Sequence, residues 1–167
     1  NASSMLMSVT AKRKPAPTPE PGVTVQIASR AAAIPSRAHF RRWAAAALKR
    51  SAQITLRIVD SREARALNKQ FRGRDYATNV LTFVYAEQTA LAGDIAICAP
   101  VVRREARAQK ISLDAHYAHL TVHGVLHLQG YDHIRTREAE RMERLEAHIL
   151  KTLGYDDPYR AETAAKA

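Results

Sequence analysis

Three histidines and one glycine in the second half of the chain have the spacing of a metal site. His123 and His127 are four residues apart in a segment, about 114–129, whose apolar residues surround most of a helix. Residues at i and i+4 on a helix have Cβ atoms about 5–6 Å apart, so their imidazole nitrogens can bind one ion. Gly130 favours the left-handed conformation that ends helices and would turn His133 back toward the pair. The pattern predicts three nitrogen ligands and an open fourth position, as in catalytic zinc sites.

The same histidines also allow a structural interpretation. Histidine pairs on apolar helices are more often core residues than metal ligands. Such core histidines are hydrogen-bonded, because an unpaired polar group there costs about 1–3 kcal/mol. The third histidine behind a glycine favours the metal site, since a structural role gives no reason for that combination. His119 lies one turn before His123 and is expected to belong to the core or to support a ligand. His39, His116 and His148 are given no functional role.

The spacing HxxxHxxGxxH is also that of the metzincin peptidases, with one decisive difference. Those enzymes have a glutamate directly after the first histidine, and it acts as the general base. In this chain the corresponding residue is Gly124. A metal ion at this site would still lower the pKa of a water molecule toward about 7. The pattern therefore indicates metal-dependent hydrolysis and disfavours a peptidase.

The string HGVLHLQGYDH at 123–133 resembles the signature of the YbeY family of bacterial metal-dependent endoribonucleases, which are ribosomal RNA maturation factors. The resemblance spans roughly residues 23–155. It also includes three upstream segments: FRGRD at 71–75, TNVLTF at 78–83 and GDI at 93–95. Phe71 and Thr82 depart mildly from the family pattern, in which tyrosine and serine are expected.

The resemblance implies a zinc-dependent endoribonuclease, a hydrolase that cleaves single-stranded RNA. It implies a role in maturation of the small-subunit ribosomal RNA 3′ end and in ribosome quality control. By that match His123, His127 and His133 are the ligands of one Zn²⁺ ion per chain, and Arg72 is the functional arginine. A guanidinium can bind a phosphate through two hydrogen bonds and stabilise charge developing on it. Three imidazoles also accept nickel or copper, so the native metal stays open.

The general base and the substrate class stay open on the residues alone. Asp132, next to His133, either accepts a proton or orients a ligand histidine, and the orienting role is the better supported of the two. Two other functions fit the same residues. One is a metal-dependent hydrolase of another substrate such as a peptide, and the other is a ribosome-associated binding protein whose metal is structural.

Strand and helix signals alternate along the chain and predict an α+β fold. The expected strands are 23–27, 54–58, 79–85 and 91–98. The expected helices are about 36–48, 60–72, 100–110, 114–129 and 136–153. This order agrees with the fold that the resemblance implies, a small mixed four-stranded sheet packed with about five helices, with a metzincin-like helix carrying the metal site.

The last of these helices is expected to close the core. Its apolar stripe comprises Met142, Leu145, Ile149 and Leu153. Its charged residues, Glu146 among them, are expected to face solvent.

The length of 167 residues favours a single folded domain. Residues 1–22, in which four prolines follow a basic run, are expected to be a disordered tag and proline-rich arm. Residues 23–155 are expected to form the metal-dependent endoribonuclease domain, and 156–167 a C-terminal tail.

Charge is distributed unevenly along the chain. Its net charge is +10, and residues 1–110 carry 19 basic and 7 acidic side chains, a net of +12. Because a one-sided positive field attracts polyanions, single-stranded ribosomal RNA is the expected partner, together with the ribosome or its small subunit. The expected phosphate contacts are Arg103, Arg104, Arg107 and Lys110.

Two further features bear on location. No run approaches the roughly 18 apolar residues of a membrane-spanning helix, so no membrane partner is expected. The single cysteine, Cys98, lies in an apolar run and is expected to be a buried small hydrophobe. One cysteine fits a reducing compartment such as the cytoplasm. The oligomeric state stays open.

Overall fold

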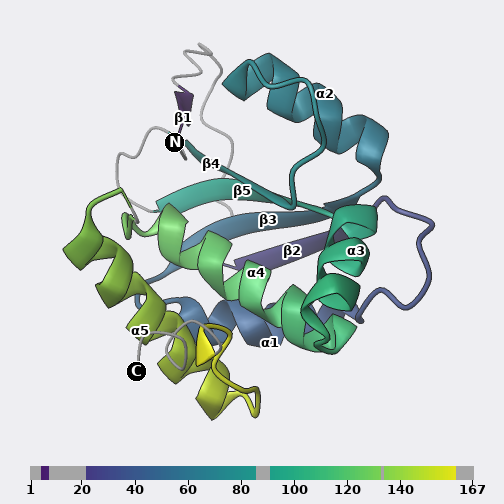
Figure 1. The fold of residues 1–167 in the computed structure, drawn as a ribbon. Helices are drawn as coiled ribbons and strands as arrows, with labels where there is room; N and C mark the ends of the chain where they lie inside the picture. The colour runs from purple at the N-terminus through teal and green to yellow at the C-terminus, as the bar shows by residue number, and fades with distance from the viewer. Residues whose placement is uncertain (1–4, 8–21, 86–90, 133, 161–167) are drawn as a thin grey trace.

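A computed structural model of the chain describes residues 5–7, 22–85, 91–132 and 134–160. Figure 1 shows a twisted sheet across the middle of the molecule with helices on both sides. The strands are β1 (Met5–Met7), β2 (Gly22–Ile27), β3 (Ala52–Val59), β4 (Val80–Tyr85) and β5 (Leu91–Cys98). The helices are α1 (Arg37–Ala47), α2 (Ser61–Arg72), α3 (Ala99–Gln109), α4 (Leu113–Leu128) and α5 (Thr136–Thr152).

The sheet has the strand order β1-β4-β5-β3-β2. Strands β2, β3 and β5 are parallel to one another, and β4 runs antiparallel to β5. The predicted mixed sheet, the five helices and the α+β class are therefore confirmed. The short strand β1, which pairs in parallel with β4 at the edge of the sheet, was not predicted. The rest of the expected arm through Pro21 and the tail from residue 161 lie outside the described residues.

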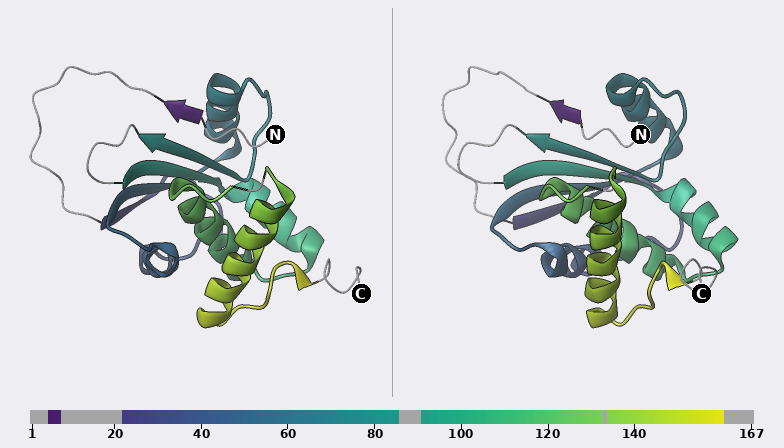
Figure 2. Two further views of the ribbon diagram at one scale, coloured as in Figure 1. Left: turned by 90° about the vertical axis from the view of Figure 1, so that its left-hand side faces the viewer. Right: turned by 60° about the vertical axis from the view of Figure 1, so that its left-hand side comes forward.

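Helices α1, α4 and α5 lie on one face of the sheet, and α2 lies on the other (Figure 2). The first face holds the main core, in which α4 lies between the sheet, α1 and α5. Its largest fully buried side chains include Phe40 and Trp43 of α1, Tyr117 and Leu126 of α4, and Leu150 of α5. Burial of these apolar surfaces positions α4 firmly, and α4 carries His123 and His127, two of the three predicted metal ligands.

The opposite face has a smaller core beneath α2. Leu67 and Phe71 of α2 pack on Leu81, Phe83 and Ala96 of the sheet. Nearby, Cys98 is 1% exposed, which confirms the expected buried hydrophobe. Among the described helices, none has both the length and the apolar character needed to cross a membrane.

At Gly93 on β5 the neighbouring strand and helix α4 approach the backbone closely. A Cβ atom added there would lie 2.6 Å from the Phe83 carbonyl oxygen and 2.7 Å from Leu128 Cδ2. The first of these atoms belongs to the backbone of β4 and cannot move away without disturbing the strand pairing. Glycine is therefore required for α4 to sit at this distance from β4 and β5.

Replacing Gly93 by alanine is expected to lower the free energy of unfolding by about 1–3 kcal/mol, because the new methyl group displaces backbone atoms. Urea denaturation measures the change. The control is Ala92→Ser, a half-buried residue next to it on β5, for which a change below about 0.5 kcal/mol is expected. An unchanged stability of Gly93→Ala would contradict the close approach described above.

Candidate metal centre

Helix α4 is buried around most of its circumference, as its apolar sequence predicts. It begins at Ser112, whose side chain accepts a hydrogen bond from the Ala115 amide at 3.1 Å. His123 and His127 are only half-buried, although their helical neighbours Val122, Val125 and Leu126 are fully buried. The two histidines therefore lie on the part of α4 that neighbouring elements leave accessible.

His123 and His127 lie next to each other, as their spacing predicts. Their ring centroids are 4.6 Å apart and the ring planes meet at 75°. Rings this close together are what shared binding of one ion requires. The structure thus brings together two of the three predicted ligands.

The turn after α4 is made as expected. Gly130 has φ of 93°, in the left-handed region, and its amide donates to the His127 carbonyl at 3.0 Å. The Tyr131 amide then donates to the Leu126 carbonyl at 3.2 Å, which closes the end of the helix. The predicted stop at Gly130 is confirmed. The third predicted ligand, His133, lies outside the described residues.

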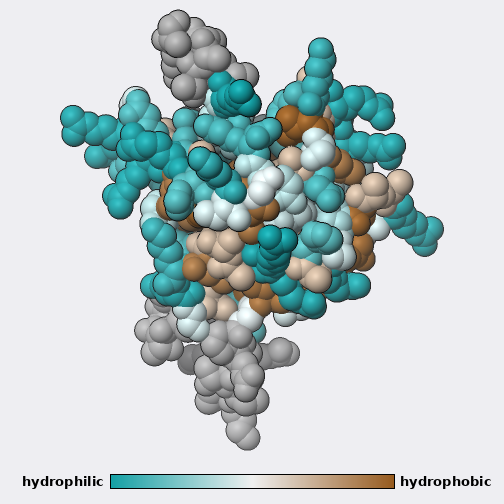
Figure 3. All heavy atoms as spheres, turned by 90° about the horizontal axis from the view of Figure 1, so that it is seen from below, coloured by the Kyte–Doolittle hydropathy of each residue, from teal (hydrophilic) through white to brown (hydrophobic). Residues whose placement is uncertain are grey.

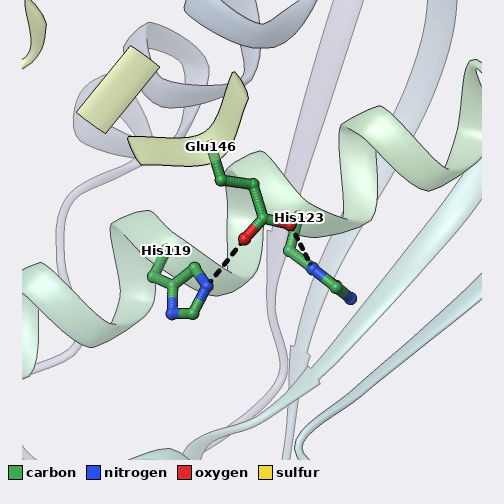
Figure 4. A group of neighbouring side chains, drawn as sticks. All are labelled: His119, His123 and Glu146. Carbon is green, nitrogen blue, oxygen red and sulfur yellow. Dashed lines mark hydrogen bonds and ion pairs between the residues drawn. The ribbon is translucent and has the colours of Figure 1, made fainter. Parts of the chain in front are cut away.

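Glu146 of α5 is a candidate site residue that sequence reasoning missed. It was expected to face solvent, but its side chain is 0% exposed and points at α4 (Figure 4). One carboxylate oxygen lies 2.5 Å from His123 Nδ1, and the other lies 3.0 Å from His119 Nε2. The Tyr159 hydroxyl also donates to the second oxygen. Glu146 is buried because these three donors replace the water that a carboxylate would otherwise need.

Hydrogen bonding keeps this buried carboxylate ionised. Burial by itself would raise the pKa of Glu146, but the hydrogen bonds from His119 and His123, together with their charges, outweigh it and lower the pKa to about 2. An ionised carboxylate is only an acceptor, so the protons in these bonds belong to the histidine ring nitrogens. A neutral His123 in this hydrogen bond carries its proton on Nδ1 and leaves on Nε2 the lone pair that a metal ion needs.

A second set of ligand atoms is also present. His119, His123 and Glu146 each offer one atom, and these atoms all lie within 4.8 Å of one another, so this group could itself hold a metal ion. His119 was assigned to the core or to ligand support, and its bond to Glu146 fits support. His123 belongs to both sets. Imidazole nitrogens with a carboxylate suit zinc and similar transition metals, so the residues fit a metal of this class.

Gly124 lies on the opposite side of α4, against the sheet. A Cβ atom added there would lie 3.1 Å from Cγ2 and 3.2 Å from Cδ1 of Ile95. A glutamate side chain at this position would have to enter the core between helix and strand. The close packing of Gly124 on Ile95 therefore disfavours a glutamate at the position of the metzincin general base.

Arg72 belongs to another layer of the molecule. It is the last residue of α2, and Gly73 ends that helix in the left-handed region with φ of 66°. Helix α2 and helix α4 lie on opposite faces of β4 and β5 (Figure 2). Arg72 is half-buried, and the sheet separates its helix from the helix of the histidine pair.

His116, which is buried, takes part in a hydrogen-bonded cluster that connects three elements of the fold. Its Nε2 atom lies 2.9 Å from Glu105 of α3, and the Asn79 side chain donates to the same carboxylate at 3.1 Å. Burial raises the pKa of Glu105, but the hydrogen bonds from His116 and Asn79 bring it below its ordinary value. This cluster ties α3 and α4 to the start of β4.

Together these features define a class: an α+β protein in which a buried helix presents paired histidines, one of them fixed by a buried carboxylate, as a candidate centre for a divalent metal. Residues 26–154 match the family described as Endoribonuclease YbeY. The chain belongs to this endoribonuclease YbeY family, as the resemblance in its sequence indicated.

Individual relatives agree with the family match. An Endoribonuclease YbeY from Thiobacillus denitrificans is 59% identical over 84% of this chain and 97% of its own length. Another, from Methylobacillus flagellatus, is 54% identical over 86% of this chain and 97% of its own length. A Thermotoga maritima protein with a solution structure has the same fold, with a TM-score of 0.50, 23% identity and coverage of 81% of this chain and 98% of the other.

Glu146→Gln tests the role of the carboxylate. The amide keeps the size of the side chain but cannot accept from His123, His119 and Tyr159 together, so the orientation of His123 is lost. We expect zinc affinity to fall about 10–100-fold, measured by competition with a chromophoric chelator. Glu140→Gln, an exposed substitution on the same helix, is the control. Equal zinc affinity of Glu146→Gln and the wild type would rule out this positioning role.

The lowered pKa of Glu146 predicts that the stability of the metal-free protein depends on pH. The ordinary pKa of 4.5 is lowered to about 2 in the fold, so the ionised group stabilises the folded state above pH 4.5. This contribution is lost as the pH falls from about 4.5 toward 2. Urea unfolding at several pH values should show the stability difference between wild type and Glu146→Gln shrinking in that window. A difference that stays constant down to pH 2 would contradict the lowered pKa.

Proposed function

We propose that this chain is a single-strand-specific, metal-dependent endoribonuclease that hydrolyses phosphodiester bonds of RNA. The biological task we propose is maturation of ribosomal RNA, at the 3′ end of the small-subunit RNA, together with ribosome quality control. The observation that carries the proposal is the match of residues 26–154 to the Endoribonuclease YbeY family. Relatives with that name align with this chain over 97% of their own length, which supports extending their activity to it.

We assign one Zn²⁺ ion per chain to His123, His127 and His133. The adjacent rings of His123 and His127 support this assignment, and His133 follows the Gly130 turn in the sequence. When bound, such an ion acts as a Lewis acid that lowers the pKa of water and neutralises charge on a phosphate oxygen.

The side chains around the histidines have separate tasks in this proposal. Glu146 accepts a hydrogen bond from Nδ1–H of His123 and thereby holds the ring with Nε2 available. His119 and Tyr159 complete the hydrogen bonds of Glu146, so that the buried carboxylate keeps its position. Asp132 is half-buried directly beside the third ligand in the sequence, and we assign it the orientation of a ligand histidine.

Arg72 is proposed to bind the phosphate that is cleaved. A guanidinium donates two parallel hydrogen bonds to phosphate oxygens and stabilises the negative charge that develops in the transition state. The two strands β4 and β5 carry α2 on one face and α4 on the other, so Arg72 and the histidines are attached to the same part of the sheet.

A peptidase is disfavoured by the absence of a glutamate after the first histidine, where Gly124 packs tightly against Ile95. A ribosome-associated protein with a structural metal would differ from the proposed enzyme in that it binds RNA without cleaving it.

We propose the ribosome or its small subunit as the partner and the cytoplasm as the compartment, in keeping with a ribosomal RNA substrate.

Substitutions in α4 and in α2, which lie on opposite faces of the sheet, separate metal binding from catalysis. His127→Ala should lose both zinc and cleavage of single-stranded RNA. Arg72→Ala should lower the cleavage rate about 100-fold or more while zinc content stays at one ion per chain. Arg72→Lys, which keeps the charge but not the paired hydrogen bonds, should restore only part of the rate.

The control is Arg62→Ala, an exposed arginine in the first turn of α2. Cleavage is measured on a labelled single-stranded RNA, and zinc by elemental analysis. Cleavage that survives removal of the metal by a chelator would refute the metal dependence. Loss of zinc in Arg72→Ala would show that the arginine is structural.

A further inference from the structure

One stretch of the chain contains basic residues and no acidic residue at all. From residue 22 to residue 59 there are seven lysines and arginines, whereas aspartate and glutamate are absent. This stretch comprises β2, α1 and β3, so its only helix is α1. Arg57 of β3 pairs with Glu63 of α2, just beyond this stretch, and the other basic residues give the stretch a surplus of positive charge.

The exposed side of α1 displays this charge. Its buried side consists of Phe40, Trp43, Ala44 and Ala47, which pack into the main core. Arg41 and Arg42 project from the other side, where Ala45 and Ala46 are also exposed. Neither arginine has a carboxylate within ion-pair distance among the described residues.

Lys49 and Arg50, both exposed, continue the charge directly after the end of α1. We call Arg41, Arg42, Lys49 and Arg50 the α1 basic face. Figure 3 shows the underside of the molecule, where long hydrophilic side chains project around more apolar surface. Arg41 and Arg42 can bind an external anion without first breaking an ion pair to a carboxylate of the described residues.

The α1 basic face reaches the turn that leads to the third histidine. The Lys49 amide donates to Gln129 Oε1 at 2.8 Å, and Gln129 Nε2 donates to the Ala47 carbonyl at 2.7 Å. The Lys49 ammonium lies 5.6 Å from the centre of the Tyr131 ring. Gln129 and Tyr131 flank Gly130, so one end of the basic face is joined to the end of α4 nearest His127.

The other basic helix, α3, is attached at the opposite end of α4. It precedes α4 with only a short connection and packs against it near His116, through the bond to Glu105. His116 and His127 are 11 residues apart on one helix, which corresponds to roughly 16 Å. Arg103, Arg104 and Arg107 are therefore farther along α4 from the histidine pair than Lys49 is.

We propose that the α1 basic face is a docking surface for the backbone of single-stranded RNA outside the cleavage site. This inference rests on the proposed function and names the surface that holds the flanking part of the substrate. Arginine and lysine neutralise phosphates regardless of the base, and none of the four residues is aromatic, so the contact is sequence-independent. RNA bound along α1 and past Lys49 would continue toward the turn at Gly130.

The test is a triple substitution, Arg41→Ala with Arg42→Ala and Lys49→Ala, in the zinc-loaded protein. Binding is measured by fluorescence anisotropy with a labelled 2′-O-methyl RNA of about 20 nucleotides, long enough to extend beyond one binding site. We expect Kd to rise about tenfold or more near 0.1 M salt, and the slope of log K against log salt to fall by about 2. A trinucleotide should show a smaller rise in Kd than the long RNA.

The matched comparison removes the same charge from α3, with Arg103→Ala, Arg104→Ala and Arg107→Ala. A smaller loss of affinity in the α3 variant than in the α1 variant supports the proposal. An equal or larger loss in the α3 variant would overturn it, because net charge or α3 would then account for binding. Circular dichroism and zinc content confirm that both variants are folded.

Two further outcomes would also overturn the proposal. If polyglutamate at equal charge competes as well as RNA, the face binds anions in general and RNA is not its specific occupant. If the α1 variant binds long RNA as the wild type does while the wild type cleaves RNA, the docking surface is wrong and the proposed function stands. A wild type that neither binds nor cleaves RNA would refute both.

Discussion

The hydrogen-bonded carboxylate of Glu146 is the interaction on which the rest of this site depends. A buried negative charge is tolerated only where donors surround it, and here two histidines from α4 and a tyrosine from the C-terminal segment provide them. The carboxylate favours the tautomer of His123 that is protonated on Nδ1, and the hydrogen bond fixes the orientation of the ring. Helix α5 is thus more than a cover for the core, since it carries the group that prepares a ligand on another helix.

Helix α4 has two sides with different requirements. On the sheet side, Gly93 and Gly124 allow the helix backbone and its strands to approach closely, and larger residues would force them apart. On the other side, His119, His123 and His127 face α5 and the accessible surface. The side of α4 that faces the sheet is filled by packed side chains, so the candidate metal ligands lie on the accessible side. The helix has the histidine spacing of metzincins, and Gly124 stands where they have their general base.

Local features of the site could be predicted from the sequence, and those that depend on tertiary contacts could not. The His123–His127 pair and the Gly130 stop follow from helix geometry and from the backbone freedom of glycine, which act over a few residues. Glu146 lies 23 residues from His123, so no local rule links them. One signal was present: Glu146 comes four residues after Met142 and three before Ile149, which places it on the buried stripe of α5. The general preference of glutamate for solvent concealed it.

The hydrogen bond from Tyr159 to Glu146 has a consequence for the order in which the protein is made. His119 and Tyr159 are 40 residues apart, and a ribosome synthesises the histidine long before the tyrosine. A nascent chain that has only reached α5 lacks one of the three donors around its buried carboxylate. The cluster of donors around Glu146 is therefore completed only after Tyr159 has left the exit tunnel of the ribosome that produced it.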